Sequence, residues 1–427
     1  MADLERLEAA VRPHGGEVRE AGPGDVVDGV AASAVARPAS AEGVAAVLRE
    51  ATAQGLATVA RGGATALDWG APPERADLIL DTTGLDRLVE HEAGDLVVVA
   101  EAGLPVAALL DHVGRAAQEL VVDLPPDRLA RGSTVGGALS TGMSGPRRLQ
   151  RGGIRDLVLG ATVVLADGTV ASSGGKVVKN VAGYDLAKLL TGAYGTLGVV
   201  VRAAFRLHPA RPERAYVVAS GPLADVAARA RAVVASQLAP AAVEIDRPAG
   251  SDVATVAVLL EGAETAVGQR AAAAAELAGG QVQEEPPGWW AALPGGSGAL
   301  PSVPAGAAPR TLVKATATLT GVAGLLAAAR DAEQRYGVGA ALRGTAAGVL
   351  YGAVTGTPEA TASAVGHLRA AAATPREGTV TVLRASHEVR AALDVWGPVG
   401  GLDLMRAVKR QLDPGRNLAP GRFVGGI

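Results

Sequence analysis

Residues 132–145 read Gly-Ser-Thr-Val-Gly-Gly-Ala-Leu-Ser-Thr-Gly-Met-Ser-Gly, a run of small residues and hydroxyl side chains. Gly136 and Gly137 are expected to open a short helix within it. The free N–H groups and the dipole at a helix N-terminus attract anions. This run therefore predicts a place where the chain holds a phosphate-bearing ligand.

A second loop of similar character lies at residues 61–66, Arg-Gly-Gly-Ala-Thr-Ala, directly after an expected strand at 57–60. Its two glycines allow a sharp turn that offers several N–H groups to one anion, and Thr65 adds a hydroxyl. The loop is neither a Rossmann fingerprint nor a Walker A motif, because it lacks both glycine patterns. Either loop alone could be an ordinary turn, but the two together favour a phosphate-bearing ligand.

Residues 174–200 collect residue types that are rare elsewhere in the chain. Three of the five lysines (Lys176, Lys179 and Lys188) and one of the two asparagines, Asn180, fall there. The cluster indicates specified chemistry, although a chance grouping in one helix and loop is the alternative. At its end, Gly-Thr-Leu-Gly introduces a strand that a flat ligand can lie against.

The composition limits the classes of protein to which the chain can belong. The chain has 427 residues, 48% hydrophobic and 19% charged, with a net charge of −3, which predicts two or three globular domains and no nucleic-acid partner. We find no apolar run long enough for a membrane span and no signal-peptide pattern, so we expect a cytoplasmic protein. With no cysteine, disulfides, thiolate metal sites and cysteinyl–flavin links are excluded, and the six isolated histidines predict no metal site.

The second half of the chain repeats one order of elements. The expected order βαββαβ occurs over 215–283 and again over 312–383. This predicts two ferredoxin-like units joined in one antiparallel sheet with helices on one face. The Gly/Pro-rich segment 286–309 between them is either a linker or a loop that shapes a site.

Together these segments resemble the FAD-binding domain of the vanillyl-alcohol oxidase/p-cresol methylhydroxylase (PCMH) type. Residues 61–67 and 132–145 resemble its two pyrophosphate-binding segments, and 151–158 and 195–200 its later flavin-lining segments. Residues 412–422, Leu-Asp-Pro-Gly-Arg-Asn-Leu-Ala-Pro-Gly-Arg, are similar to its C-terminal return to the flavin.

Within this superfamily, residues 133–148 and 176–190 are most similar to the FAD-binding, non-D-type subunit of bacterial three-subunit glycolate oxidase. The resemblance implies a small 2-hydroxy acid as substrate, and a D-type flavoprotein and an iron–sulfur protein as partner subunits. It also implies noncovalent FAD, because neither pyrophosphate-binding segment contains histidine or cysteine.

The fold implied by the resemblance is α+β, with two subdomains that clasp FAD and a cap over the isoalloxazine ring. Its expected parts are an N-terminal helix and connector at 1–32, the PCMH-type domain at 33–212, the cap at 213–385 and a returning C-terminal segment at 386–427.

The resemblance also implies a set of cofactor-binding residues along these segments. They are Arg61, Gly62, Gly63, Ala64, Thr65, Ala66, Pro125, Gly132, Ser133, Thr134, Gly136, Gly137, Thr141, Gly142, Arg151, Asp156, Gly195, Thr196, Gly198, Val199, Val200 and Asn417.

Oxidation of a hydroxy acid needs a cation for the carboxylate, a base for the hydroxyl proton and a flavin for the hydride. Arg384 and His387 are the candidates for the first two roles, with Lys176 or Lys179 as the alternative cation. A structural role for each is the alternative. For the whole chain, three functions are possible. It is a catalytic dehydrogenase subunit, a noncatalytic subunit that carries FAD for assembly or electron relay, or a standalone alcohol oxidase.

Overall fold

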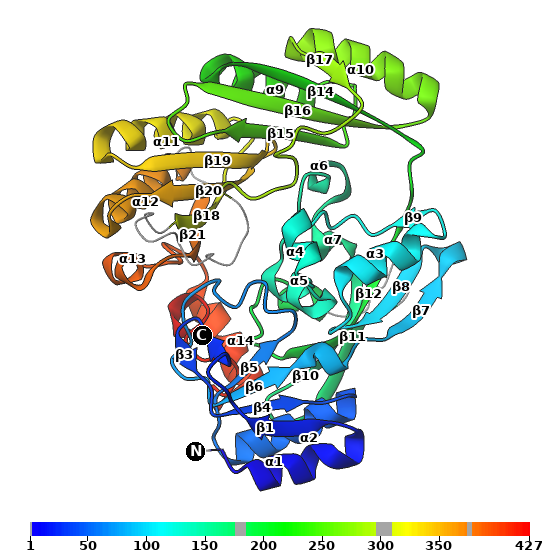
Figure 1. Cartoon of the computed structure of the whole chain (residues 1–427), viewed down its shortest axis with the longest axis vertical. Coiled ribbons are helices and arrows are strands. Elements are labelled where there is room, and N and C mark those ends of the chain that lie inside the picture. The colour runs from blue at the N-terminus through cyan, green and yellow to red at the C-terminus, as the bar shows by residue number, and fades with distance from the viewer. Residues whose placement is uncertain (1, 176–184, 296–309, 374–377) are drawn as a thin grey trace.

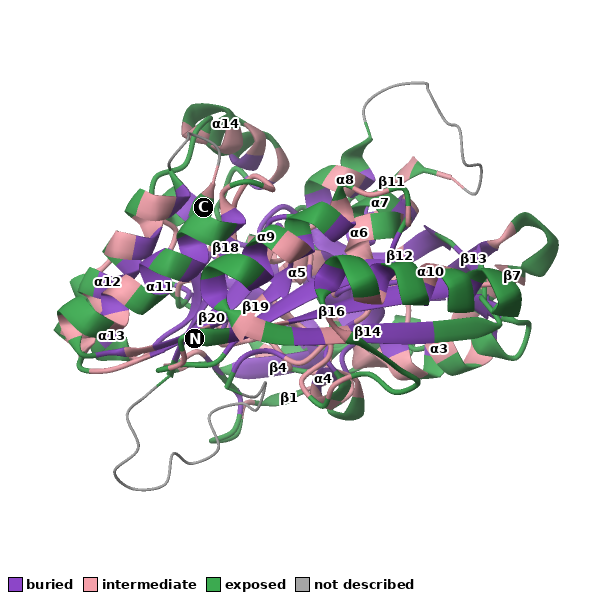
Figure 2. Ribbon diagram, turned by 90° about the horizontal axis from the view of Figure 1, so that it is seen from above, coloured by how far each residue is buried: buried purple, intermediate pink, exposed green. Residues whose placement is uncertain are grey.

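The computed structural model describes residues 2–175, 185–295, 310–373 and 378–427. It mixes helices and strands in a lower part built around two sheets and an upper part built around a third (Figure 1). Buried residues concentrate in the strands and on the sheet-facing sides of the helices (Figure 2). None of the described helices is long and apolar enough to cross a membrane.

The first sheet has four strands in the order β1-β4-β6-β5, with β4, β6 and β5 parallel and β1 antiparallel at the edge. Ser40 caps the crossover helix α2 by accepting a hydrogen bond from the N–H of Gly43, as its place before the helix predicts. The bounds are β1 Glu17–Glu20, β4 Ala34–Arg37, β5 Thr58–Arg61, β6 Leu78–Asp81, α1 Leu4–Val11 and α2 Ala41–Ala53, with a small hairpin of β2 Val26–Val27 and β3 Val30–Ala31. Sequence patterns had assigned β1 to a connector, because its residues Glu-Val-Arg-Glu are mostly exposed on this edge.

The second sheet has five antiparallel strands in the order β11-β10-β12-β8-β7. Its strands are β7 Leu88–Glu92, β8 Val97–Glu101, β10 Val158–Val164, β11 Val170–Gly174 and β12 Val199–Arg206. The remaining elements of this part are α3 Val106–Gly114, α4 Pro126–Ala130, α5 Val135–Thr141, α6 Arg148–Arg151, α7 Ile154–Leu157, α8 Leu186–Leu190 and the pair β9 Gln118–Glu119 with β13 His208–Pro209.

The third sheet has eight antiparallel strands in the order β17-β14-β16-β15-β19-β20-β18-β21, and we call it the cap sheet. The chain passes twice through strand, helix, two strands, helix and strand, and the two passes meet where β15 pairs with β19. The bounds are β14 Glu213–Pro222, α9 Leu223–Val234, β15 Ala242–Arg247, β16 Val253–Gly262, α10 Glu264–Ala278 and β17 Gln281–Gln283, then β18 Arg310–Thr316, α11 Val322–Tyr336, β19 Gly339–Thr345, β20 Val349–Thr355, α12 Pro358–Ala372 and β21 Thr379–Arg384.

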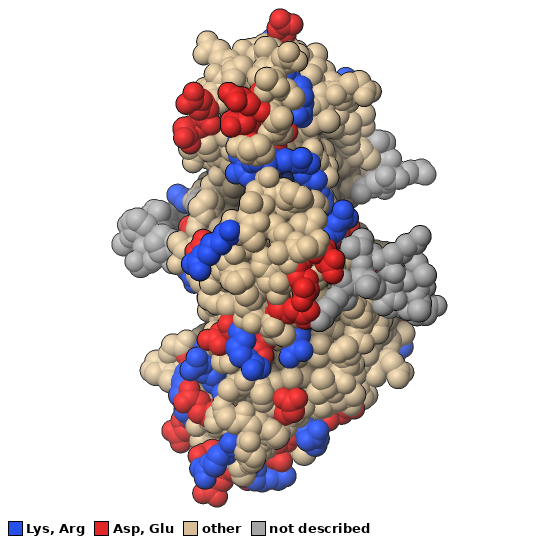
Figure 3. Space-filling model, turned by 90° about the vertical axis from the view of Figure 1, so that its right-hand side faces the viewer, with Lys and Arg blue, Asp and Glu red and all other residues tan. Residues whose placement is uncertain are grey.

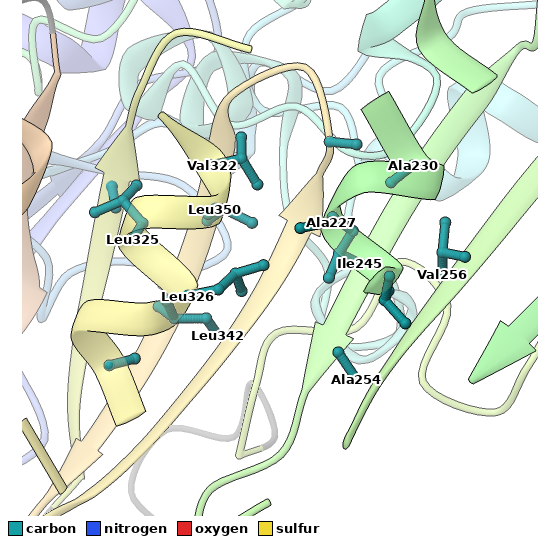
Figure 4. Close-up of a cluster of buried hydrophobic side chains, with 14 of the residues drawn as sticks. Ala227, Ala230, Ile245, Ala254, Val256, Val322, Leu325, Leu326, Leu342 and Leu350 are labelled. Atoms are coloured by element: carbon teal, nitrogen blue, oxygen red, sulfur yellow. The ribbon is translucent and has the colours of Figure 1, made fainter. Parts of the chain in front are cut away.

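The two faces of the cap sheet are buried against different partners. Figure 4 shows alanines of α9 and leucines of α11 packed on branched side chains of the strands beneath them, such as Ile245 and Leu342. On the opposite face, Leu312, Tyr351 and Leu383 join the core of the second sheet. Because side chains alternate along a strand, residues of β18, β20 and β21 on this face pack against the lower part of the protein.

The C-terminal segment returns across the molecule to the first sheet. It contains α13 His387–Ala392 and α14 Leu402–Leu412, and then pairs with β5, where the N–H of Thr58 donates to the carbonyl of Asn417 at 2.7 Å. Buried Lys409 holds this return in place. Its Nζ donates to the Asp413 carboxylate and to the carbonyls of Thr196 and Leu418 at 2.7–2.9 Å.

Replacing Lys409 by methionine should lower the free energy of unfolding by about 3–5 kcal/mol, because it leaves the Asp413 carboxylate buried without its cation. Chemical denaturation measures this free energy. The matched control is Arg410→Met, which removes an exposed charge from the same helix and should have little effect. Equal losses in the two variants would show that Lys409 does not carry this part of the fold.

Candidate functional site

A pocket that is open to solvent lies between the two lower sheets. We call it the interdomain pocket. It is lined by the loop after β5, by α5 and by the start of β12. The lining residues are Val59, Ala60, Arg61, Gly62, Gly63, Ala64, Thr65, Ala66, Leu67, Thr82, Leu124, Arg128, Ser133, Thr134, Gly136, Gly137, Ala138, Ser140, Thr141, Met143, Tyr194, Gly195, Gly198, Val199, Val200 and Arg422.

Two glycine-containing loops approach each other closely at this pocket. A Cβ atom at Gly62 would lie 2.2 Å from Thr134 Oγ1, and one at Gly63 would lie 1.9 Å from the carbonyl oxygen of Gly132. A larger residue at either position would force the loops apart. The side-chain oxygens of Thr65 and Ser133 also lie 2.8 Å apart, within hydrogen-bond distance.

The first of these loops offers backbone donors to the pocket. Among the described residues, no protein group accepts from the N–H groups of Gly63, Ala64 and Thr65. Ala64 has a φ of +55°, so the loop turns through a left-handed residue. Successive N–H groups in such a turn form a concave anion site, which agrees with the sequence-based expectation for this loop.

The N-terminus of α5 has fewer free donors than expected. The N–H of Val135 donates to Leu104 O at 2.9 Å and that of Gly136 to Ala102 O at 2.7 Å. The N–H of Gly137 donates to Thr134 Oγ1 at 3.3 Å. This helix packs on the segment that follows β8, so its first N–H groups donate to acceptors within the protein. It contributes mainly hydroxyl groups to the pocket, together with the close contact between its loop and Gly62 and Gly63.

Arg61 lines the pocket, but its charge is matched by carboxylates. Its guanidinium donates to Asp25 and Asp81, each at 2.8 Å. Although burial opposes it, these two bonds raise the pKa of Arg61 above its usual value. Arg61 therefore connects strands at the floor of the pocket and adds little net charge.

Several lining residues were not identified from sequence. Arg128 and Arg422 are buried, and Tyr194 stands edge-on to Trp396 with ring centres 5.5 Å apart. Burial raises the pKa of the Tyr194 hydroxyl, so this group stays protonated. Arg128 lies in no motif, whereas Arg422 ends the segment 412–422 that resembles the C-terminal return to the flavin, and Tyr194 lies in the stretch rich in rare residue types.

A second cavity adjoins the first at Thr141 and Tyr194 and lies between the cap sheet and the lower part of the protein; we call it the cap cavity. Lys314 of β18 lines it together with Arg148. Burial, and then repulsion by Arg148, lowers the pKa of Lys314 to about 8. The other lining residues are Gly142, Ser144, Gly153, Ile154, Arg155, Asp156, Thr191, Gly192, Thr381, Leu383, Trp396 and Phe423.

The structure brings fifteen of the twenty-two expected cofactor-binding residues to the interdomain pocket: Arg61, Gly62, Gly63, Ala64, Thr65, Ala66, Ser133, Thr134, Gly136, Gly137, Thr141, Gly195, Gly198, Val199 and Val200. Gly142 and Asp156 line the cap cavity, and Pro125 lines a smaller neighbouring cavity beside Glu244.

Four expected cofactor-binding residues lie outside these linings. The carbonyl oxygen of Gly132 packs against Gly63. Thr196 is fully buried and its hydroxyl donates to Ala193 O, while the Asn417 side chain donates to Thr52. Arg151 ends the short helix α6 and lines none of the three cavities.

The structure does not bring the two described catalytic candidates, Arg384 and His387, into one site. Arg384 is buried in an ion pair with Asp68 at 3.3 Å, whereas His387 is exposed at the start of α13. Lys179, like Lys176, Asn180 and Tyr184, lies outside the described residues. Within the part of the chain that the structure describes, no group of three or more acidic or histidine side chains is arranged to hold a metal ion.

Replacing Gly63 by alanine should weaken binding of the implied FAD at least tenfold, because the added methyl group separates the two loops that line the pocket. Titration of the apoprotein with FAD, followed by fluorescence, measures this. The control is Gly114→Ala at the end of α3, where a Cβ meets no atom within 4 Å. Unchanged FAD affinity in the Gly63 variant would contradict the role assigned to this contact.

Comparison with known proteins agrees with this geometry. Residues 32–174 match the family model of an FAD binding domain. The D-lactate dehydrogenase of Archaeoglobus fulgidus is 35% identical over 210 residues, which are 49% of this chain and 46% of that protein. Glycolate oxidase subunit GlcD of Bacillus subtilis is 34% identical over 44% of this chain and 40% of that subunit, and subunit GlcE of Escherichia coli is 36% identical over 29% and 34%. The chain thus spans less than half the length of each of these relatives.

Solved structures extend the likeness to the whole chain. p-Cresol methylhydroxylase with substrate bound superimposes with a TM-score of 0.72 at 16% identity, over 98% of this chain and 95% of that one. The 4-ethylphenol oxidase of Gulosibacter chungangensis gives 0.69 at 16% identity, over 92% and 90%. This chain therefore contains an FAD-binding domain at residues 32–174 and has, over nearly its full length, the fold of p-cresol methylhydroxylase.

Proposed function

We propose that this chain is an FAD-dependent oxidoreductase that oxidises a small 2-hydroxy acid, as the FAD-binding subunit of a glycolate oxidase-like complex. The observation that carries the proposal is the pair Arg148 and Lys314, two cations that line one cavity next to the flavin pocket. As part of the same proposal, the cap sheet is a duplicated ferredoxin-like unit, because each half has its own strands in the spatial order 4-1-3-2.

The interdomain pocket fits FAD. The pyrophosphate needs several hydrogen-bond donors, which the N–H groups of residues 63–65 provide. The flat ring systems need apolar walls, and the lining provides Leu124, Met143, Val199 and Val200. We assign the first two to the isoalloxazine ring and the last two to the adenine. The cap cavity adjoins the pocket at Tyr194, so we place the reactive ring at the end nearest Tyr194.

Arg148 is suited to hold the substrate carboxylate. Its buried Nη1 has no hydrogen-bond partner among the described residues. A buried donor without a partner costs free energy, so the site favours a ligand that accepts from it. A guanidinium pairs with a carboxylate through two parallel bonds, which also fixes the orientation of the acid.

Lys314 is suited to receive the hydroxyl proton. An amine with a pKa of about 8 is neutral in a useful fraction of molecules near neutral pH and can act as a base. When FAD is bound, it supplies the acceptor for the hydride that leaves the same carbon. Trp396 packs edge-on against Tyr194 and Phe423, and the three rings form an aromatic wall at this end of the cavity.

The noncatalytic alternative is a subunit that carries FAD for assembly or electron relay. It is favoured by the placement of Arg384 in an ion pair and of His387 at the surface, which leaves two of the expected catalytic residues outside the site. In either role we propose a D-type flavoprotein and an iron–sulfur protein as partners, in the cytoplasm. The iron–sulfur centre would be bound by another chain, because this one has no cysteine.

Anaerobic mixing of the FAD-loaded chain with glycolate or D-lactate separates the two roles. We expect the flavin absorbance to bleach with the isolated chain. If the flavin stays oxidised alone and bleaches only after a D-type partner is added, the chain is a carrier or relay subunit. Rapid reoxidation of the bleached chain by oxygen would instead indicate a standalone oxidase.

Replacing Lys314 by methionine should lower kcat/KM about 10²- to 10⁴-fold, the usual contribution of a general base. In the unmodified chain, kcat/KM should rise with pH and level off above about 8, because the neutral amine is the active form. Lys314→Arg should retain the positive charge but lose this rise.

The control for the Lys314 variants is Lys188→Met, which removes a lysine that pairs with Asp185 on α8. Its pH profile should match that of the unmodified chain. A profile that remains unchanged in both Lys314 variants would refute the assignment of the base.

A further inference from the structure

Two buried arginines hold the loop that follows the pyrophosphate-binding turn. Arg128 Nη1 donates to Thr65 O. Arg422 donates to Leu67 O at 3.0 Å and to Trp69 O at 2.7 Å. The two side chains, only 2% and 3% exposed, thus bind alternate carbonyls of residues 65–69.

These arginines are not ion-paired. Within the described ranges, no carboxylate lies in ion-pair contact with either guanidinium, in contrast to Arg61. Nε and Nη2 of Arg128 also have no hydrogen-bond partner there, and its guanidinium lies 4.3 Å from the centre of the Trp69 ring. Burial lowers the pKa of Arg128 to about 10, so it remains a cation at neutral pH.

Nearby acids offset this charge only in part. Asp68 is the strongest charged neighbour of Arg128, but it also pairs with Arg384 at 3.3 Å. Asp127 is a further neighbour, and Arg384 and Arg131 add charge of the opposite sign. The wall of the pocket around Trp69 therefore carries excess positive charge.

This charge lies at the end of the pocket that meets the cap. The N–H of Gly70 donates to Leu383 O of β21 at 2.8 Å, which ties the loop to the cap sheet. Arg128 and Arg422 line the pocket together with Tyr194, which also lines the cap cavity. The excess positive charge thus belongs to the ring end of the pocket.

We propose that Arg128 and Arg422 tune the redox potential of the bound flavin by stabilising the negative charge that its ring gains on reduction. Transfer of a hydride adds two electrons and one proton, and so adds one negative charge to a neutral ring. A fixed cation in a buried, low-dielectric wall stabilises such a charge more than water does. The two arginines need not touch the ring, so we call them tuning residues, and the inference requires bound FAD but no particular substrate.

The test measures the midpoint potential of the FAD-loaded chain and its affinity for sulfite, an anion that adds to the ring and leaves negative charge there. Arg128→Met should weaken sulfite binding at least tenfold and lower the potential by about 30 mV, the equivalent of a tenfold change for a two-electron couple. Arg128→Lys keeps the charge and should restore most of both values.

A substitution of opposite sign separates charge from structure. Asp68→Asn removes a neighbouring negative charge and should shift the potential upward and strengthen sulfite binding. Arg115→Gln, an exposed site after α3, is the control and should change neither value.

Opposite shifts in the Arg128→Met and Asp68→Asn variants would support the inference. It would be overturned if the potential stayed within experimental error in both, or if both moved in the same direction. A loss of FAD affinity in Arg128→Met with the potential and sulfite affinity unchanged would also overturn it, since the charge would then serve the pyrophosphate.

Discussion

The close contact between two loops about 70 residues apart in sequence supports the rest of the site. Gly62 and Gly63 lie against Thr134 and Gly132 at separations that no Cβ atom allows. That contact brings the end of β5, a parallel strand of the first sheet, against the short helix α5, which packs on the second sheet. The pocket exists because these two edges meet with only backbone and hydroxyl groups between them, which leaves donors for a phosphate and little bulk.

The cap sheet contributes side chains to the site because successive residues of its strands face opposite sides. Val313 and Ala315 of β18 pack under the cap helices, whereas Leu312 and Lys314 face the lower part of the protein. Lys314 pairs across the sheet with Tyr351 on one side and Thr381 on the other, so polar residues of neighbouring strands form a row above the flavin domain. The loop that carries Trp69 is tied to the cap sheet by the hydrogen bond from Gly70 N–H to Leu383 O, and in our proposal the reacting end of the cofactor lies there.

Local patterns predicted much of the fold, and the order of elements in the cap agrees with the expected repeat. Ser40 before an amphipathic run predicts the start of α2, and paired glycines predict where the chain comes close to a ligand. The resemblance, by contrast, assigns cofactor binding to whole segments of the chain. In a tight turn, some residues of such a segment face away from the ligand. Thr196 and Asn417 are of this kind, because their polar groups bond to the protein interior.

The site residues that sequence did not identify depend on contacts between distant segments. Arg128 lies in the short helix α4, which carries no motif, and it contributes to the site because Trp69 and Thr65 contact it from another part of the chain. The sequence offers one signal for Lys314, a lysine flanked by Leu312, Val313 and Ala315 in one strand, but the register of the sheet decides which face it lies on. Arg384 and His387 lie three residues apart, yet one is buried and the other exposed, because β21 ends and α13 begins between them.

A structure of the chain with FAD and oxalate, an unreactive analogue of a 2-hydroxy acid, tests this account most directly. The account predicts the pyrophosphate on the N–H groups of residues 63–65, the isoalloxazine ring at the Tyr194 end, and the oxalate carboxylates on Arg148 and Lys314. A cofactor bound in the reverse direction, with its ring against Val199 and Val200, or oxalate bound away from the cap cavity, would contradict it.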